Sequence, residues 1–413
     1  MRIAVVGSGV SGLVCAHLLG PRHEVVLFEA SDRVGGHVHT VSVPEPDGPV
    51  AVDTGFIVFN ERTYPNFVRL LARLGVASQE SDMSFSVRSE RRDLEYGGAG
   101  LSALFAQRRN LLSPRFLRMV LDVLRFYREA PALRQEGPEV ALLDWLEGHG
   151  YSPAFVEDHL LPLVGAVWSS NREGARTFPA RFLARFLDNH GLLQLRDRPT
   201  WRTIRGGSGT YVKALLDGFR GEVRTGCPVA SIRREGTSVA LRPAGAAAER
   251  FDHAILACHA DQALRLLEDP SPEELELLSA FPYRDSEVVL HRDERLMPRS
   301  RRAWSSWNYH LDDEARAGAS VTYWMNQLQR LPSPRQYFVT LNRASAVAGE
   351  RVVRRLDYRH PVFTAAGVAA QTRHPELIGH RRTSYCGAYW RNGFHEDGVV
   401  SALAACAPLG GAL

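Results

Sequence analysis

The chain has 413 residues, of which 45% are hydrophobic and 23% charged, which is the composition of an ordinary globular protein with room for two or three domains. No apolar run after the N-terminus is long enough to cross a membrane as a helix. The formal net charge is only +4, and the absence of a recognised nucleic-acid motif argues against a nucleic-acid partner.

The first 28 residues predict a strand, a glycine-rich turn, a helix and a second strand. Arg2–Val6 is a short apolar run typical of a buried strand, and Ser11–Leu19 has a helical periodicity that Gly20-Pro21 ends. Glu24–Phe28 is a second buried strand. Three glycines spaced G-x-G-x-x-G lie between the first strand and the helix, which is where a dinucleotide-binding βαβ unit requires them.

Each glycine of this turn has a physical role. Gly7 permits the tight turn out of the strand, Gly9 lets a pyrophosphate approach the backbone, and Gly12 lets the helix pack closely on the strand. The helix points its free N–H groups and the positive end of its dipole at the phosphates. The rival interpretations are a signal peptide and a plain structural turn. The glycines and the acid that closes the second strand do not fit a signal peptide. The predicted dinucleotide contacts in this turn are Gly7, Ser8, Gly9, Val10, Ser11 and Gly12.

The segment after the second strand indicates which dinucleotide binds. Glu29 lies 17 residues after Gly12, where a carboxylate accepts hydrogen bonds from ribose hydroxyls and disfavours the extra phosphate of NADP. Residues 29–36 read E-x-x-x-R-x-G-G, which resembles the FAD-binding start of the flavin amine oxidase and carotenoid desaturase superfamily. The resemblance implies FAD, with Arg33 and the Gly35-Gly36 backbone supporting its pyrophosphate. The contacts implied here are Glu29, Ala30, Arg33, Gly35, Gly36 and His37.

Two later segments are similar to the same superfamily. Residues 50–59 predict a strand interrupted by Asp53-Thr-Gly55, which resembles the D-x-G turn close to the flavin ring and implies contacts from Gly55 and Phe56. A short strand at Val229 precedes the buried strand of residues 252–258. In the superfamily a strand at this place passes the adenine, which implies a contact from Val229.

The C-terminal region carries a third motif. A strand ends in Cys386-Gly387, and after a loop Gly393-Phe-His-Glu396 matches the superfamily's G-x-x-E before the last helix. The N-terminus of that helix would face the flavin, where negative charge builds on reduction. The contacts implied here are Gly387, Phe394, His395 and Glu396. The His395 side chain is the one candidate catalytic group, and a purely structural histidine is the alternative.

The regions between these motifs predict a substrate domain. Residues 98–200 are mostly helical in pattern, and two stretches, 101–134 and 176–205, each hold seven arginines against two acidic residues, giving +5 apiece. A docking surface for anionic lipid and an ordinary solvated helix face both stay open as interpretations. Residues 283–380 predict aromatic-rich strands, which suit either the sheet of an apolar substrate chamber or a plain core.

The predicted fold is α/β, with a Rossmann-like FAD-binding domain built on a parallel sheet and interleaved with an α+β substrate domain. The FAD-binding domain is expected to comprise residues 1–80, 205–282 and 381–413. The substrate domain is expected to comprise residues 81–204 and 283–380.

The resemblance covers essentially the whole chain and implies a lipid-directed function. Phrases such as TYWMNQLQ and YCGAYWRNGFHEDG look like a bacterial subgroup whose members often accompany cyclopropane-fatty-acid-synthase-type methyltransferases. The resemblance implies an FAD-dependent oxidoreductase that dehydrogenates an unsaturated or methyl-branched fatty acyl chain, with a methyltransferase as a partner. The alternatives are a fatty acid double-bond isomerase, an amine oxidase and a non-catalytic flavin-bound partner of a lipid methyltransferase.

Amine oxidation is disfavoured by one departure from the superfamily pattern. Many amine-oxidising relatives hold a water beside the flavin N5 with a lysine of the substrate domain. Lys213 is the only lysine in this chain, and it follows the glycine turn of residues 206–209 on the cofactor side.

The cysteines and the charge pattern predict a location. The five cysteines show no C-x-x-C and no paired spacing, which predicts reduced thiols and a cytoplasmic protein, peripheral to the inner membrane if the arginines contact lipid. Cys386 lies near the predicted flavin region, where a small packed residue is favoured over a covalent flavin link. We predict no metal site.

Overall fold

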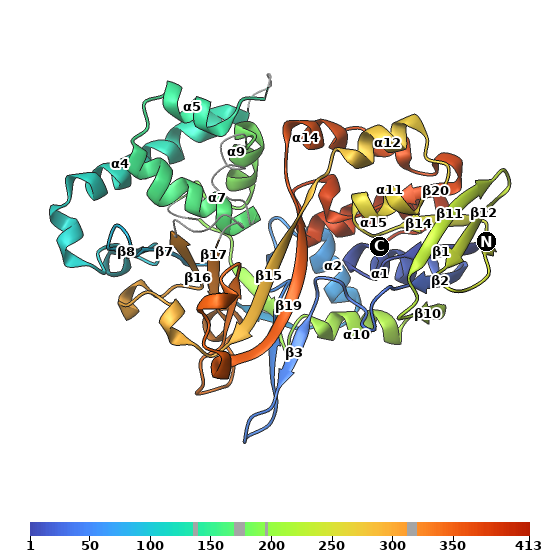
Figure 1. The fold of residues 1–413 in the computed structure, drawn as a ribbon, viewed down its shortest axis with the longest axis horizontal. Coiled ribbons are helices and arrows are strands. Elements are labelled where there is room, and N and C mark those ends of the chain that lie inside the picture. The colour runs from blue at the N-terminus through green and yellow to red at the C-terminus, as the bar shows by residue number, and fades with distance from the viewer. Residues whose placement is uncertain (135–138, 169–177, 195–196, 312–319) are drawn as a thin grey trace.

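The computed structural model describes residues 1–134, 139–168, 178–194, 197–311 and 320–413. Figure 1 shows two halves, one built on a parallel sheet and carrying both termini, the other combining a mixed sheet with a group of helices. Arg176 and Arg196 of the second arginine-rich stretch lie outside the described residues. None of the described helices is long and apolar enough to cross a bilayer.

A five-stranded parallel sheet forms the first half, in the order β10-β2-β1-β14-β20. Its strands are β1 (Arg2–Val6), β2 (Glu24–Phe28), β10 (Glu222–Arg224), β14 (His253–Leu256) and β20 (Thr383–Tyr385). The parallel sheet predicted from the first βαβ unit is confirmed.

Both faces of this sheet are buried, which explains why β1 reads as an unbroken apolar run. Ile3 and Val5 of β1 join a core shared with the helices on one face, whereas Ala4 and Val6 join a second core on the other face. The helices of the first face are α1 (Val10–Leu19), α2 (Pro65–Arg73), α10 (Gly209–Asp217) and α15 (His395–Cys406). The second face is covered by β11 (Val229–Glu235), β12 (Ser238–Pro243), β13 (Glu249–Phe251), α11 (Ala260–Leu266) and α12 (Pro272–Ser279).

A seven-stranded sheet forms the base of the second half, in the order β19-β15-β18-β17-β16-β7-β8. Neighbouring strands are antiparallel except β16 and β7, which pair in parallel. The strands are β7 (Phe85–Ser89), β8 (Leu94–Gly97), β15 (Tyr283–His291), β16 (Trp307–Leu311), β17 (Ser320–Trp324), β18 (Phe338–Leu341) and β19 (Val352–Pro361).

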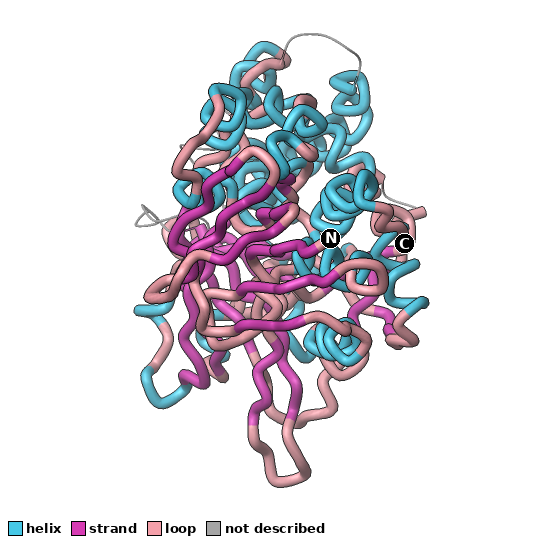
Figure 2. The backbone as a smooth tube through the Cα atoms, turned by 90° about the vertical axis from the view of Figure 1, so that its right-hand side faces the viewer, coloured by secondary structure: helices cyan, strands magenta, loops and turns pink. Residues whose placement is uncertain are grey.

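A group of helices lies against one end of this sheet, as Figures 1 and 2 show. These helices are α3 (Leu101–Leu104), α4 (Pro114–Glu129), α5 (Leu142–Gly148), α6 (Pro153–Phe155), α7 (Leu161–Trp168) and α9 (Ala180–Asn189). They share a core with strands β7 and β8 through Val87 and Tyr96. The helical character predicted for residues 98–200 is confirmed for the described part of that range.

Two small sheets connect the halves. Strands β3 (Thr40–Val43) and β4 (Val50–Asp53) form a hairpin, and β9 (Trp201–Ile204) pairs with both β5 (Val58–Asn60) and β6 (Ser78–Glu80). The pairing of β6 with β9 joins segments that we assigned to different domains. The domain division at residues 80 and 204 therefore stays a prediction. The predicted boundary passes through the small sheet of β5, β9 and β6.

Candidate cofactor and substrate site

The glycine-rich turn between β1 and α1 makes an open cradle at the helix N-terminus. A Cβ on Gly7, whose φ is +101°, would lie 2.9 Å from the Ala257 carbonyl oxygen, and a Cβ on Gly12 would lie 1.8 Å from the Gly7 carbonyl oxygen. These two glycines are thus required by backbone packing. Gly9 differs, because a Cβ there would meet no atom within 4 Å. The open space beside Gly9 and the free N–H groups of α1 fit the pyrophosphate of a dinucleotide.

The Glu29 carboxylate, at the carboxyl end of β2, is held by two serines. One of its oxygens accepts hydrogen bonds from the Ser8 amide, at 3.0 Å, and from the Ser8 hydroxyl. The other accepts from the Ser31 amide and hydroxyl, both at 2.9 Å. A ribose hydroxyl would share this carboxylate with the serines, and the ribose contact of Glu29 stays a prediction.

Arg33 fixes the loop that follows β2. Its guanidinium donates to the carbonyl oxygens of Val38 and Gly36, each at 2.7 Å. Gly35 and Gly36 have φ values of +119° and +58°, which a residue with a side chain rarely adopts. The guanidinium therefore bonds its own loop, and a direct contact with pyrophosphate stays a prediction.

The Asp53-Thr-Gly55 turn connects several distant segments. The Asp53 carboxylate accepts hydrogen bonds from the Ser208 amide at 2.9 Å and from Gln329 Nε2 at 2.8 Å. Burial raises the pKa of Asp53 to about 6. A Cβ on Gly55 would lie 2.0 Å from the His37 carbonyl oxygen, so this turn packs directly on the loop after β2.

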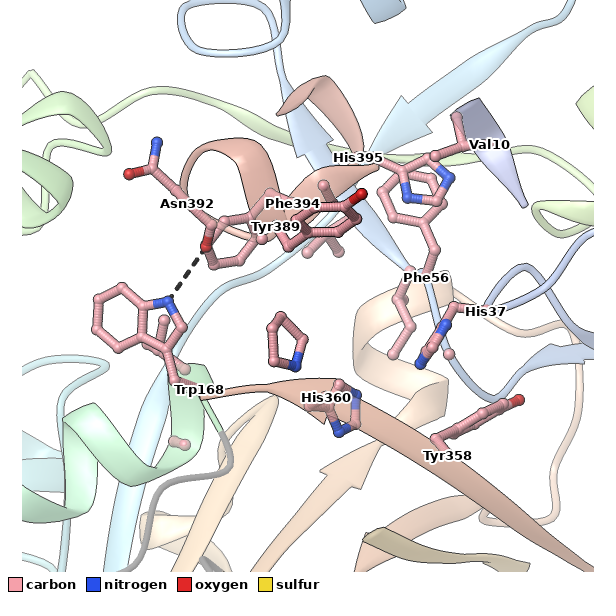
Figure 3. A pocket seen from close by; sticks show the side chains of 18 of the residues that line it. Val10, His37, Phe56, Trp168, Tyr358, His360, Tyr389, Asn392, Phe394 and His395 are labelled. Carbon is pink, nitrogen blue, oxygen red and sulfur yellow. Dashed lines mark hydrogen bonds between the residues drawn. The ribbon is translucent and has the colours of Figure 1, made fainter. Parts of the chain in front are cut away.

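His395 begins α15 and lies against Phe56, as Figure 3 shows. Their rings stack with centroids 3.5 Å apart and an interplanar angle of 7°. His395 Nε2 hydrogen-bonds the Tyr211 hydroxyl at 2.7 Å, and burial lowers the pKa of His395 to about 3. The imidazole is therefore neutral at pH 7, with one nitrogen already engaged.

Glu396 has a structural role that the motif did not reveal. Its carboxylate accepts hydrogen bonds from the Asn66 amide at 3.1 Å, from Asn66 Nδ2 at 2.6 Å and from the Phe67 amide at 2.9 Å. The two backbone amides are the first N–H groups of α2, which would otherwise lack partners. The neighbouring Asp397 accepts from the Phe394 amide at 2.9 Å, and burial raises the pKa of Asp397 to about 7.

A cavity of about 360 Å³ extends from the cradle into the second half of the molecule. Many predicted cofactor residues line it, namely Val10, Ser11, Gly35, His37, Gly55, Phe56, Gly387, Phe394 and His395. The other predicted residues do not: Gly7, Ser8, Gly9, Gly12, Glu29, Ala30, Arg33, Gly36, Val229 and Glu396. Many of the other lining residues are aliphatic or aromatic, among them Met83, Phe85, Leu163, Val167, Trp168, Phe186, Val288, Trp307, Tyr323, Leu341 and Phe363. Of the two interpretations left open for the aromatic strands, both apply in part: Trp307 and Tyr323 line the cavity, whereas Tyr337 is buried in the core.

Three histidines line one side of the cavity, and we define them as the histidine cluster: His37, His259 and His360. Figure 3 shows two of them, His37 and His360. The His37 ring centroid lies 6.0 Å from that of His259 and 5.3 Å from that of His360, and it stacks on Tyr358 at 5.0 Å. Burial lowers the pKa of His37 to about 4 and those of His259 and His360 to about 3. His37 Nε2 and His259 Nδ1 have no hydrogen-bond partner among the described residues.

Sequence reasoning missed His259 and His360. A signal existed for His259, because it directly follows the predicted buried strand of residues 252–258, and ligands bind at the carboxyl ends of parallel strands. His360 is near the end of β19, in the second half, and no local pattern marks it.

The cavity wall holds little charge. Among the described residues that line it, Arg359 is the one charged side chain, and it bonds Asp261 at 3.0 Å and Asp285 at 2.9 Å. Lys213 lies elsewhere, exposed on α10, where it pairs with Asp217. Within the described part of the chain, no group of His, Cys, Asp and Glu side chains is arranged to hold a metal ion.

Comparison with known proteins gives one family match. A family model described as flavin containing amine oxidoreductase matches residues 10–303. The flavin-dependent L-tryptophan oxidase RebO of Lentzea aerocolonigenes is 27% identical over 262 residues, covering 56% of this chain and 52% of that protein. The chain thus spans about half the length of this curated relative.

Solved structures match over nearly the whole chain. A putative protoporphyrinogen oxidase from Exiguobacterium sp. aligns with a TM-score of 0.71 and 15% identity, covering 99% of this chain and 98% of that one. A CLA-producing fatty acid isomerase from P. acnes aligns with a TM-score of 0.68 and 14% identity, covering 98% of each chain. At these identities the likeness concerns the fold alone, and the predicted fold class is confirmed.

Proposed function

The chain belongs to the flavin-containing amine oxidoreductase family, and we propose that it is an FAD-dependent oxidoreductase that dehydrogenates an unsaturated or methyl-branched fatty acyl chain. The prediction of FAD as the cofactor is confirmed by the family match and by the flavin-dependent relative. The narrower methyltransferase-associated subgroup and a methyltransferase partner stay predictions.

The chemistry of the cavity wall is the observation that carries this proposal. Most of the wall is aliphatic or aromatic, and its polar part, which holds the histidine cluster and Arg359, includes neither a carboxylate nor a lysine among the described residues. An alkylammonium ion would lose its hydration there without gaining an anionic partner, which is costly. An acyl chain, in contrast, gains about 0.8 kcal/mol for each methylene group that leaves water.

Dehydrogenation of an acyl chain removes two hydrogens from adjacent carbons, one as a hydride equivalent and one as a proton, and leaves a double bond. FAD, when bound, supplies the acceptor for the hydride equivalent. The histidine cluster offers neutral imidazoles to accept the proton, and two of their buried nitrogens have no hydrogen-bond partner among the described residues. His395 is a weaker candidate, because its Nε2 already bonds Tyr211.

A double-bond isomerase is the runner-up. An apolar chamber of the same kind would suit that reaction, and the P. acnes protein with a similar fold is described as a fatty acid isomerase. Isomerisation moves a double bond without net oxidation. The two reactions therefore differ in product mass and in the final redox state of the flavin.

The test is anaerobic mixing of the FAD-loaded protein with detergent-solubilised acyl phospholipid. We expect the visible flavin absorbance to bleach and the product to be two hydrogens lighter than the substrate. An unsaturated product of unchanged mass, with the flavin oxidised at the end, would favour the isomerase. Bleaching by a long-chain alkylamine or by L-tryptophan, and not by the lipid, would overturn the proposal.

A matched pair of variants tests the proton acceptor. His259→Gln should slow flavin bleaching, but by less than the roughly 10²–10⁴-fold contributed by a general base whose pKa is near the operating pH, because burial lowers the pKa of His259 to about 3. His17→Gln is the control, because His17 is a partly buried histidine of α1 that does not line the cavity. Equal bleaching rates in the two variants would exclude His259 as the acceptor, and His360→Gln would then be the next variant to measure.

A further inference from the structure

An unusual set of exposed leucines lies on α4 and on the segment before it. The fractional exposures are 76% for Leu101, 47% for Leu111, 87% for Leu112, 38% for Leu117, 62% for Leu121 and 40% for Leu124. We define these six residues as the leucine face. They account for six of the nine large hydrophobic side chains that are exposed in the described part of the chain. All six lie within 24 residues of the chain. Single exposed leucines are ordinary, whereas a concentration of them indicates a contact surface.

The geometry of α4 explains how the patch forms. Phe116, Met119 and Phe126 are buried and face the helical core. Leu117, Leu121 and Leu124 follow an i, i+4, i+7 spacing, which places them in one stripe away from that core. A helix on a water-exposed surface normally has polar residues there. α4 is therefore apolar on its outward side as well as on its inward side.

Arginines border the leucine face. Several are neutralised by acidic partners: Arg115 pairs with Asp158 at 2.9 Å and Arg118 with Asp122 at 3.3 Å. Arg108 and Arg128 are exposed, and neither forms an ion pair within the described residues. The +5 of residues 101–134 therefore overstates the local charge, because acids from other segments offset part of it. The remaining electrostatic attraction to anions is modest, and the leucines supply the larger part of the surface that a partner would contact.

We propose that the leucine face docks the protein on the surface of an anionic lipid bilayer. An exposed apolar stripe bordered by cationic side chains is the pattern of a helix that lies in the membrane interface, with its leucines among the acyl chains and its arginines at the phosphates. Charge complementarity selects an anionic bilayer over a neutral surface. Figure 1 places α4 at the outer edge of the second half of the molecule, far from the parallel sheet, where a flat surface can reach it.

The test measures vesicle binding by the FAD-loaded protein, by co-sedimentation with phosphatidylglycerol–phosphatidylcholine vesicles at low salt. The double variant Leu112→Glu, Leu121→Glu should bind at least about tenfold more weakly, because two exposed leucines no longer enter the interface. Leu275→Glu is the matched control, since Leu275 is 48% exposed on α12 and should bind like the wild type. Arg108→Gln with Arg128→Gln should reduce the preference for anionic over zwitterionic vesicles. Flavin content should be equal in all variants.

Several outcomes would overturn this proposal. A wild type that ignores vesicles at low salt would do so, as would a double variant that binds them like the Leu275→Glu control. A concentration-dependent dimer that the double variant dissociates, without any vesicle binding, would show instead that the leucine face joins two copies of the chain. Because vesicle binding is measured without turnover, each of these results leaves the proposed reaction to its own test.

Discussion

Gly9→Val should strongly weaken FAD binding and leave the fold of the FAD-free protein intact. The backbone at Gly9 has φ −64° and ψ 179°, which any residue adopts, and a Cβ there would meet no protein atom within 4 Å. The FAD-free variant should therefore unfold within about 1 kcal/mol of the wild type, which is the usual range for a helix N-cap substitution. The added isopropyl group fills the space that the cradle leaves for a pyrophosphate.

The magnitude follows from the backbone N–H groups of the cradle. Displacing the pyrophosphate from two such groups would lose two charge-assisted hydrogen bonds of about 1.5–3 kcal/mol each. The sum of about 3–6 kcal/mol corresponds to a dissociation constant about 10²–10⁴-fold weaker. Titration of the FAD-free protein with FAD, followed by flavin fluorescence, measures this change, and thermal unfolding measures stability.

The controls separate crowding of the cofactor from damage to the fold. Gly148→Val makes the same change on α5, where a Cβ also meets nothing within 4 Å, and it should bind FAD normally. Gly12→Ala should destabilise the protein with or without FAD, because its Cβ would lie 1.8 Å from the Gly7 carbonyl oxygen. If Gly9→Val binds FAD as tightly as the wild type, the pyrophosphate does not lie at this cradle.

Three other changes have defined outcomes. Glu396→Ala should lower the free energy of unfolding by about 1–3 kcal/mol, because the Asn66 and Phe67 amides lose their acceptor. Urea unfolding that matches the wild type would contradict the role of Glu396 as a cap of α2. Lys213→Gln should leave flavin reduction unchanged, since this exposed lysine is outside the cavity, and a loss of more than about tenfold in single-turnover mixing would require a lysine-dependent mechanism. The free energy of unfolding should fall as the pH drops from about 6.5 toward 4. Buried histidines such as His37 and His259 have folded-state pKa values of about 4 and 3. In this pH window the unfolded chain therefore binds more protons than the folded protein does. Burial raises the pKa values of Asp53 and Asp397, and these two groups act in the opposite direction. The histidines with lowered pKa values outnumber them. A urea midpoint that does not change with pH across the window would refute this balance.

Features that depend on neighbouring residues could be predicted from the sequence. The strand, turn and helix at Arg2–Leu19 follow from glycine spacing and apolar runs, and the structure confirms them almost to the residue. Features that depend on distant residues could not be predicted in this way. Glu396 was matched to a cofactor motif, yet its carboxylate bonds the start of α2, 330 residues earlier in the chain. His360 reaches the cavity only because β19 of the second half ends beside the loop of His37.

The arginine-rich stretches show the same division between local and tertiary information. Counting residues gave the charge of 101–134 correctly, but the acids that neutralise part of it, such as Asp93 and Asp158, come from outside the stretch. The exposed leucines between those arginines had no distinctive pattern in the sequence. An apolar residue at helical spacing predicts a buried face, and only the packed structure shows that α4 has a second, unburied one.

The parallel sheet also has a consequence for folding of the chain during its synthesis on the ribosome. The Arg2 amide bonds the Asp252 carboxylate, 250 residues later, and β1 cannot pair with β14 until that later segment has emerged. At about 5–20 residues per second, synthesis of the intervening chain takes on the order of 10–50 s. During that time the apolar strands β1 and β2 have no neighbour on one edge. Helix α15, which packs on α1, is synthesised later still. The half built on the parallel sheet is therefore expected to finish folding after the second half. A chaperone that shields apolar strands should raise the yield of folded protein during synthesis, with little effect on the refolding rate of the completed chain.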